Sequence, residues 1–175
     1  TLNASIRNES PISRVKYVNS NSILSDNIQN QVFKKFIDFV ERMLLFYSLD
    51  SRGYEGFMNG SESIAEGIVN SGKVKDFQEF LKENNIDYEL YGCEVDGRKA
   101  IYCHFDNKDA DFFKIASTGT RSLALFYYWY IRMEKASFVF IDEFDAFYHY
   151  ELSESVQKRL RRISDVQVFT TTHNT

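Results

Sequence analysis

The sequence predicts an α/β chain in which buried parallel strands alternate with helices, next to an N-terminal helical region and a small antiparallel β-hairpin. Three observations carry this prediction. Residues 138–141 are a short apolar run of the kind found in buried parallel strands. Apolar residues recur at helical spacing on either side of it, over 121–135 and 152–163. The dipeptide Asp96-Gly97 separates two alternating segments, which indicates a hairpin.

Composition sets the class of protein. The chain has 175 residues, of which 43% are hydrophobic and 16% aromatic, enough for a globular domain with a sizeable core. Its formal charge of −4 argues against a globally basic, nucleic-acid-binding surface, and no apolar run is long enough to span a membrane. The chain does not begin with Met and has no secretory signal pattern, so we expect a piece of a longer cytoplasmic protein.

The two cysteines are expected to be reduced. The Asp96-Gly97 turn sets Cys93 opposite residue 100 and not opposite Cys103, so a disulfide between them is not expected.

The remaining elements follow from periodicity and turn residues. We divide the chain into a helical region at 1–86, a β-subdomain at 87–116 and an α/β core at 117–175. The expected helices are 27–49, 61–70, 76–83, 121–135 and 152–163, and the expected strands are 88–95, 99–105, 112–116, 138–141 and 166–171. The helix at 121–135 is so aromatic that we expect it to be buried between layers.

Two carboxylates directly follow the apolar strand at 138–141. In open parallel sheets, ligands bind off the carboxyl ends of the strands, so Asp142 and Glu143 would stand at a site. One acid can hold Mg²⁺, which favours hard oxygen ligands, while the other faces a water molecule. The alternative is that the two acids belong to a solvated loop.

Two further segments favour a site at these acids. The residues from Ser117 to Thr120 start a helix and offer backbone N–H groups to an anion, although an ordinary N-cap would look the same. His173 ends the last strand, and one helix separates that strand from the one before Glu143. A right-handed crossover would therefore bring His173 and Glu143 to the same sheet edge.

The order of these segments resembles a known family. Ser-Thr-Gly-Thr-Arg at 117–121, Phe-Ile-Asp-Glu-Phe-Asp-Ala-Phe-Tyr-His at 140–149 and Phe-Thr-Thr-Thr-His-Asn at 169–174 resemble the C-terminal half of ABC-type ATPase domains. The closest resemblance is to the stand-alone bacterial AAA ATPases of the abortive-infection and OLD-like group. It implies a partial P-loop NTPase sheet, with ATP and Mg²⁺ as cofactors.

The resemblance also implies roles by position. Asp142 would be the metal-binding carboxylate of the Walker B motif, Glu143 would polarise the attacking water, and His173 would be the switch histidine at the γ-phosphate. Residues 116–120 would be the signature loop, which binds ATP held by the other subunit. Their sequence, Ala-Ser-Thr-Gly-Thr, departs from the common Leu-Ser-Gly-Gly-Gln form. The nucleotide-binding residues would be Ser117, Thr118, Gly119, Thr120, Arg121 and, in the D-loop, Asp145.

A phosphate-binding loop of the form Gly-x-x-x-x-Gly-Lys-Ser/Thr is missing. Residues 67–74 come near it, but Val74 lacks the hydroxyl that binds Mg²⁺, and the preceding segment reads as a helix and not as a buried strand. We therefore expect the Walker A lobe to lie outside this chain, which alone would be inactive.

The resulting hypothesis is that the chain is the C-terminal part of an ATPase that hydrolyses ATP at a homodimer interface. Hydrolysis would drive an effector in bacterial defence, with a nuclease or DNA as the partner. One alternative is a metal-dependent nuclease or hydrolase built from Asp142, Glu143 and His173, with Asp145 and His149 as further ligands. Another is a non-catalytic dimerisation module. Basic residues on the last helix are expected to form a solvated face: Lys158, Arg159, Arg161 and Arg162.

Overall fold

A computed structural model describes residues 25–47, 53–56, 62–106, 108–144 and 150–172, and the chain divides into two compact units, residues 1–41 and 42–175. The first unit contains helix α1 (Ile28–Glu41). Four apolar side chains of α1 have exposed fractions between 41% and 80%: Ile28, Val32, Phe36 and Phe39.

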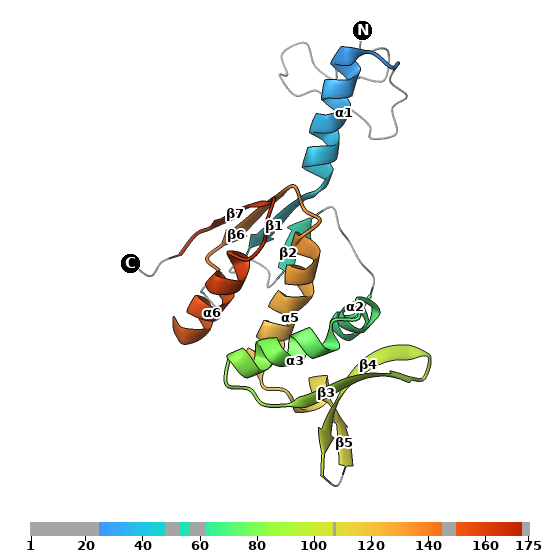
Figure 1. Ribbon diagram of the computed structural model, residues 1–175, viewed down its shortest axis with the longest axis vertical. Coiled ribbons are helices and arrows are strands. Elements are labelled where there is room, and N and C mark those ends of the chain that lie inside the picture. The colour runs from blue at the N-terminus through green and yellow to red at the C-terminus, as the bar shows by residue number, and fades with distance from the viewer. Residues whose placement is uncertain (1–24, 48–52, 57–61, 107, 145–149, 173–175) are drawn as a thin grey trace. The chain divides into compact units, whose positions relative to one another are not determined.

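The second unit is built on a four-stranded sheet with the order β2-β1-β6-β7 (Figure 1). Strands β1 (Met43–Tyr47), β6 (Phe138–Asp142) and β7 (Gln167–Thr170) are parallel, and β2 (Gly53–Gly56) pairs antiparallel with β1. Strand β6 is therefore central, and its Val139 is fully buried. The parallel pairing of β6 with β7 confirms that these two strands run side by side in one direction.

Helix α5 (Thr118–Met133) forms the core with three other helices, α2 (Ile64–Asn70), α3 (Val74–Glu83) and α6 (Tyr150–Leu160). The ring of Tyr127 on α5 lies 5.0 Å from that of Phe77 and 5.6 Å from that of Phe80, both on α3. Five consecutive aromatic residues of α5, 126–130, are all buried, so this part of the helix is covered on every side, which confirms that it is packed between layers.

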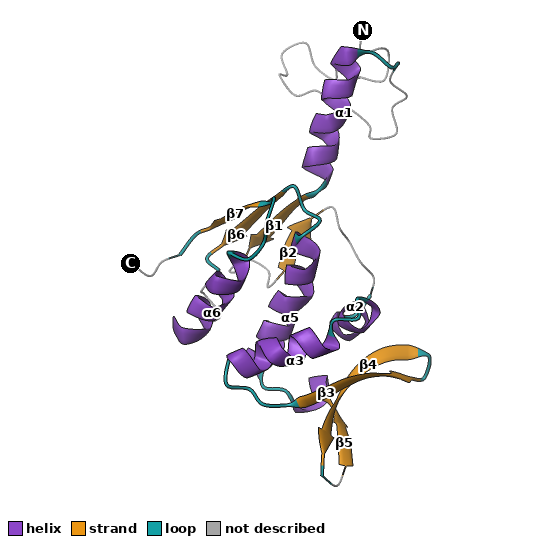
Figure 2. Ribbon diagram, viewed as in Figure 1, coloured by secondary structure: helices purple, strands orange, loops and turns teal. Residues whose placement is uncertain are grey.

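A second sheet is antiparallel, with the order β3-β4-β5 (Figure 2). Strands β3 (Glu89–Val95) and β4 (Arg98–Phe105) form the predicted hairpin, and Asp96 and Gly97 both have positive φ, 50° and 76°, as a two-residue turn of this kind requires. Cys93 pairs with Ala100, as the turn predicts, and both cysteines are free. The mixed α/β fold of the sequence prediction is thus confirmed.

Two element predictions are wrong. The helix expected over 27–49 ends at Glu41, and Met43–Tyr47 forms strand β1 between β2 and β6. The apolar residues of β1 continue the helical spacing by chance, while pairing with β2 and with the distant strand β6 determines their structure. The strand expected at 112–116 is the helical turn α4 (Phe112–Ile115), capped by the Asp111 side chain, and strand β5 is instead the polar segment Lys108–Asp111.

The division at 86 and 116 stays a prediction. Among the helices that the structure describes, none has the length and apolar character needed to span a membrane.

Candidate functional site

The acidic pair lies at the carboxyl end of the central strand. Asp142 is the last residue of β6 and pairs in register with Tyr47 of β1, while the preceding Ile141 pairs with Thr170 of β7. Asp142 and Glu143 are half-buried, and Phe144 behind them is buried. The strand prediction is therefore confirmed, and it places both carboxylates where open parallel sheets bind their ligands.

Thr171, one residue beyond β7, holds this end of β6 in place. Its hydroxyl donates a hydrogen bond to Oδ1 of Asp142 at 2.6 Å and accepts one from the backbone N–H of Glu143 at 2.7 Å. Its backbone N–H donates to the Ile141 carbonyl at 3.0 Å, and its carbonyl accepts from the N–H of Phe144 at 3.1 Å. Thr171 is not among the site residues that the sequence pattern predicts. The available signal was a polar residue at the end of the strand predicted to neighbour β6.

Glu143 has a left-handed backbone, with φ of 48°. This conformation costs a residue with a Cβ atom about 1–2 kcal/mol. The hydrogen bond from its N–H to Thr171 helps to offset that cost. The chain therefore turns immediately after the strand, at the residue predicted to activate water.

The residues present fit a magnesium ion bound together with nucleotide phosphates. Magnesium typically takes one or two carboxylates and completes its shell with phosphate oxygens and water. Asp142 supplies such a carboxylate, and its Oδ1 is oriented by the Thr171 hydroxyl. Within the described ranges, no three His, Cys, Asp or Glu side chains gather closely enough to hold a metal by themselves.

The predicted signature loop is the N-terminus of α5. Ser117 caps the helix because its Oγ accepts from the Thr120 N–H at 3.1 Å and lies 2.9 Å from the Thr120 hydroxyl. Thr118 and Gly119 are exposed, and outside the backbone of its own helix the atom nearest to a Cβ on Gly119 would be Ser117 Oγ, at 3.9 Å. Arg121 donates from Nε to the Ala116 carbonyl at 3.0 Å, so it fixes the loop. The prediction that anions bind at this exposed N–H end of α5 stays a prediction.

The loop and the acidic pair lie apart within one chain. The N-terminal end of α5 lies beside α3, and its other end lies beside the four-stranded sheet (Figure 1). The structure thus places Asp142 and Glu143 at the end of β6 and residues 117–121 at the start of α5. The remaining predicted site residues, Asp145 and His173, lie outside the described residues, as does His149 of the alternative metal site.

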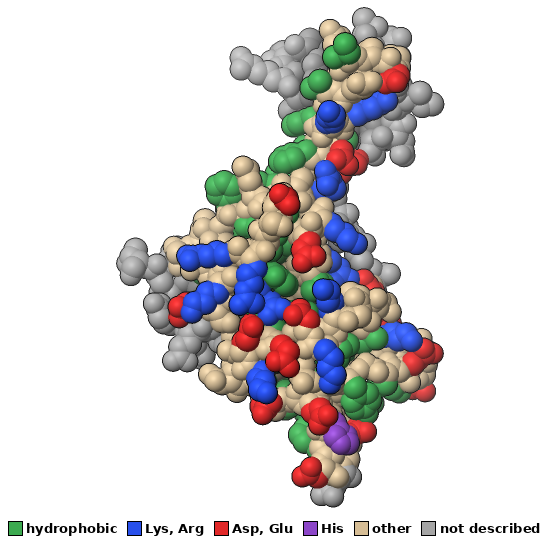
Figure 3. Space-filling view, in the orientation of Figure 1, with side chains coloured by type: hydrophobic (Ala, Val, Ile, Leu, Met, Phe, Trp, Pro, Cys, Tyr) green, Lys and Arg blue, Asp and Glu red, His purple; other side chains and the backbone are tan. Residues whose placement is uncertain are grey.

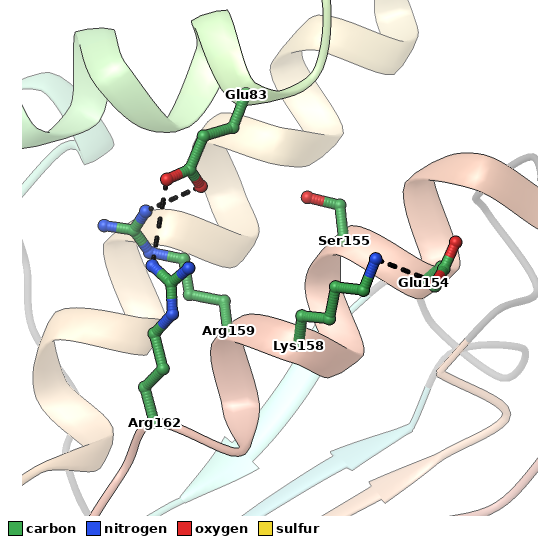
Figure 4. Close-up of a pocket in the computed structure, with 6 residues that line it drawn as sticks. All are labelled: Glu83, Glu154, Ser155, Lys158, Arg159 and Arg162. Carbon is green, nitrogen blue, oxygen red and sulfur yellow. Dashed lines mark hydrogen bonds and ion pairs between the residues drawn. The ribbon is translucent and has the colours of Figure 1, made fainter.

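A polar groove of about 340 Å³ lies between α3 and α6 (Figure 4). Its cations are neutralised locally, because Lys158 pairs with Glu154 at 2.8 Å and Arg159 and Arg162 both pair with Glu83. Acidic and basic side chains are also interspersed on the face shown in Figure 3. The groove therefore lacks the uncompensated charge of a phosphate or nucleic-acid site.

The prediction of a solvated basic face on α6 is wrong for Arg159. This residue is 6% exposed, and its guanidinium group lies over three aromatic rings and beside two carboxylates. Arg161 and Arg162 are exposed, as expected.

A central parallel strand that ends in a carboxylate pair, within a mixed α/β fold, is typical of the P-loop NTPase class. The chain belongs to the family described as "AAA domain, putative AbiEii toxin, Type IV TA system", whose model matches residues 16–175. Membership gives the chain an ATPase-like, nucleotide-binding function at the level of the family. No curated protein matches the chain.

Proposed function

We propose that this chain is the part of an ABC-type ATPase that supplies the hydrolytic carboxylates and the signature loop. The observation that carries the proposal is the Asp142-Glu143 pair at the carboxyl end of β6, the strand flanked by β1 and β7. Family membership supports ATP as the nucleotide.

Each carboxylate has a distinct role in this proposal. Asp142 would hold Mg²⁺ through its carboxylate, which Thr171 orients by a hydrogen bond to Oδ1. When bound, the ion neutralises charge on the β- and γ-phosphates. Glu143 accepts a hydrogen bond from the attacking water and so orients it towards the γ-phosphate. His173 contacts that phosphate, and Asp145 belongs to the loop that meets the other subunit.

The signature loop acts on ATP held by a second copy of the protein. The positions of the two elements support this arrangement, because the loop begins helix α5 beside α3, whereas the acidic pair ends strand β6 of the four-stranded sheet (Figure 1). The phosphate-binding loop comes from a Walker A lobe outside residues 1–175. ATP would then be enclosed at a homodimer interface, and its hydrolysis would drive an effector such as a nuclease in bacterial defence.

The test is Glu143→Gln in the natural full-length protein. Glutamine keeps the shape of the side chain and cannot take a proton from water, so we expect steady-state ATP turnover to fall at least about 100-fold. Binding of Mg-ATP, measured by calorimetry, should stay within about threefold of wild type.

The matched control is Glu134→Gln at the end of α5, where the glutamate is exposed. It should hydrolyse ATP at the wild-type rate. Unchanged turnover in Glu143→Gln contradicts the role assigned to Glu143, and a wild-type protein that neither binds nor hydrolyses ATP contradicts the function as a whole.

A further inference from the structure

The side-chain and backbone groups of Thr171 contact four consecutive residues, 141–144, at the end of the neighbouring strand. We propose that Thr171 is a positioning residue of the hydrolytic site, which sets the carboxylate of Asp142 and the backbone of Glu143 through its hydroxyl group. This inference rests on the proposed ATPase function, and it adds a residue to which neither the sequence pattern nor the family match assigns a role.

The hydroxyl group performs two tasks at once. A threonine hydroxyl has one proton to donate and two lone pairs that accept. The proton goes to Oδ1 of Asp142 at 2.6 Å, and a lone pair receives the N–H of Glu143 at 2.7 Å. A carboxylate oxygen accepts hydrogen bonds, so the hydroxyl proton of Thr171 fixes the orientation of the Asp142 carboxylate.

The Thr171 hydroxyl binds the backbone of Glu143 at a strained position. The φ of 48° at Glu143 lies in the left-handed region, which side chains with a Cβ atom disfavour. The N–H of that residue is held by the Thr171 hydroxyl, so the direction in which the Glu143 side chain leaves the backbone depends on Thr171. One hydroxyl thus links the metal-binding acid to the acid that orients water.

A purely structural role for Thr171 would be carried by its backbone. The bonds of its N–H to Ile141 and of its carbonyl to Phe144 continue the pairing of β7 with β6. Any residue except proline makes these bonds, so Thr171→Val keeps them and also keeps the branched shape of the side chain. Valine removes the hydroxyl alone, whereas serine retains it.

The experiment compares Thr171→Val, Thr171→Ser and the control Thr170→Val in the full-length protein. Thr170 is the neighbouring β-branched residue in β7, and it lies outside the site assigned above. ATP turnover is measured over a range of ATP and Mg²⁺ concentrations. Because displacements of about 1 Å can cost about 100-fold in rate, we expect kcat of Thr171→Val to fall about 10- to 100-fold.

The accompanying constants distinguish positioning from general damage. The calorimetric Kd of Thr171→Val for ATP should change less than about threefold, while the Mg²⁺ concentration for half-maximal turnover should rise. Thr171→Ser should recover kcat to within about threefold of wild type, and Thr170→Val should match wild type.

Three results would overturn the inference. These are wild-type kcat and Mg²⁺ dependence in Thr171→Val, equal impairment of the serine and valine variants, or equal impairment of Thr170→Val. If Glu143→Gln abolishes turnover while Thr171→Val leaves it intact, the proposed function stands and the positioning role is wrong. If the wild-type protein has no ATP turnover, the proposed function is wrong and the inference is wrong with it.

Discussion

At the scale of single residues, Arg159 joins helices α3, α5 and α6. Its Nη2 atom lies 2.8 Å from Oδ2 of Asp76, and its guanidinium carbon lies 5.0 Å from the ring centre of Phe80 and 5.1 Å from that of Tyr130. Burial raises the pKa of Asp76, but the hydrogen bond from Tyr127 and the charge of Arg159 outweigh it and hold that pKa below the usual carboxyl range. The arginine is therefore part of the core.

Arg159→Ala should lower the free energy of unfolding by about 2–3 kcal/mol, less than for a fully buried pair because Asp76 is half-exposed. Urea denaturation measures this change, with Lys158→Ala as the control, since that lysine makes an exposed pair with Glu154 and should matter by less than about 0.5 kcal/mol.

The loss of stability in Arg159→Ala should become smaller as the pH falls. Because the folded-state pKa of Asp76 is lowered, its ion pair stabilises the protein above the ordinary carboxyl pKa, and this contribution is lost as pH falls through the folded pKa. The difference between wild type and Arg159→Ala should thus shrink below about pH 4. A larger difference in acid, or equal effects of the two substitutions at neutral pH, would contradict the role of Arg159.

At the scale of elements, helix α2 approaches α5 at a glycine. The helix starts with a capping box in which Ser63 and Glu66 satisfy each other's backbone N–H groups. One residue later, a Cβ on Gly67 would lie 2.3 Å from Cε2 of Tyr128 and 2.7 Å from Nη2 of Arg132. The ring of Tyr128 is buried and the Arg132 guanidinium group lies 3.6 Å from its centre, so the ring cannot move at low cost.

Gly67→Ala should therefore destabilise the protein, although alanine is the better helix former. Alanine gains about 1 kcal/mol of helix propensity, but overpacking costs about 1–3 kcal/mol and the clash is severe, so we expect a net loss of about 1–2 kcal/mol in denaturant unfolding. Asn70→Ala, at the exposed end of the same helix, should change stability by less than about 0.5 kcal/mol. A stabilised Gly67→Ala variant would show that α2 does not pack closely on α5.

Local signals predicted the elements that depend on local chemistry. The hairpin register follows from the two positive-φ residues Asp96 and Gly97, and the start of α5 follows from the Ser117 cap. Strand β1 escaped prediction because its five residues extend the helical spacing of α1, and pairing with β2 and β6 decides their structure. The polar strand β5 was missed for a similar reason, since its pairing with β4 stabilises it without an apolar face.

The candidate site shows the same limit. The carboxylates were predictable because they directly follow an apolar strand. Three successive threonines, 170–172, precede His173, and nothing in the sequence distinguishes the one whose hydroxyl meets Asp142. The register of β7 against β6 makes that choice. The prediction for Arg159 was wrong for a similar reason. Its charge predicts exposure to solvent, while its neighbours on α3 and α5 supply partners within the core.

At the scale of the whole molecule, the proposed site is complete when two copies meet. The acidic pair ends strand β6, and the signature loop begins helix α5 at a different place in residues 42–175. Each copy would therefore contribute one half to each of two sites. Variants that damage different halves should then complement one another in a mixed dimer. One of its two sites would combine an intact acidic pair from one copy with an intact signature loop from the other.

The most direct test of this account mixes Glu143→Gln with Gly119→Asp in the full-length protein. Gly119 is exposed and has room for a side chain, and an acid in the first turn favours a helix while it repels phosphate, so Gly119→Asp should fold and lose activity. ATP turnover is measured for each variant alone and after subunit exchange. The account predicts two inactive variants whose mixture hydrolyses ATP at a clear fraction of the wild-type rate. A mixture that forms mixed dimers and stays inactive would contradict it.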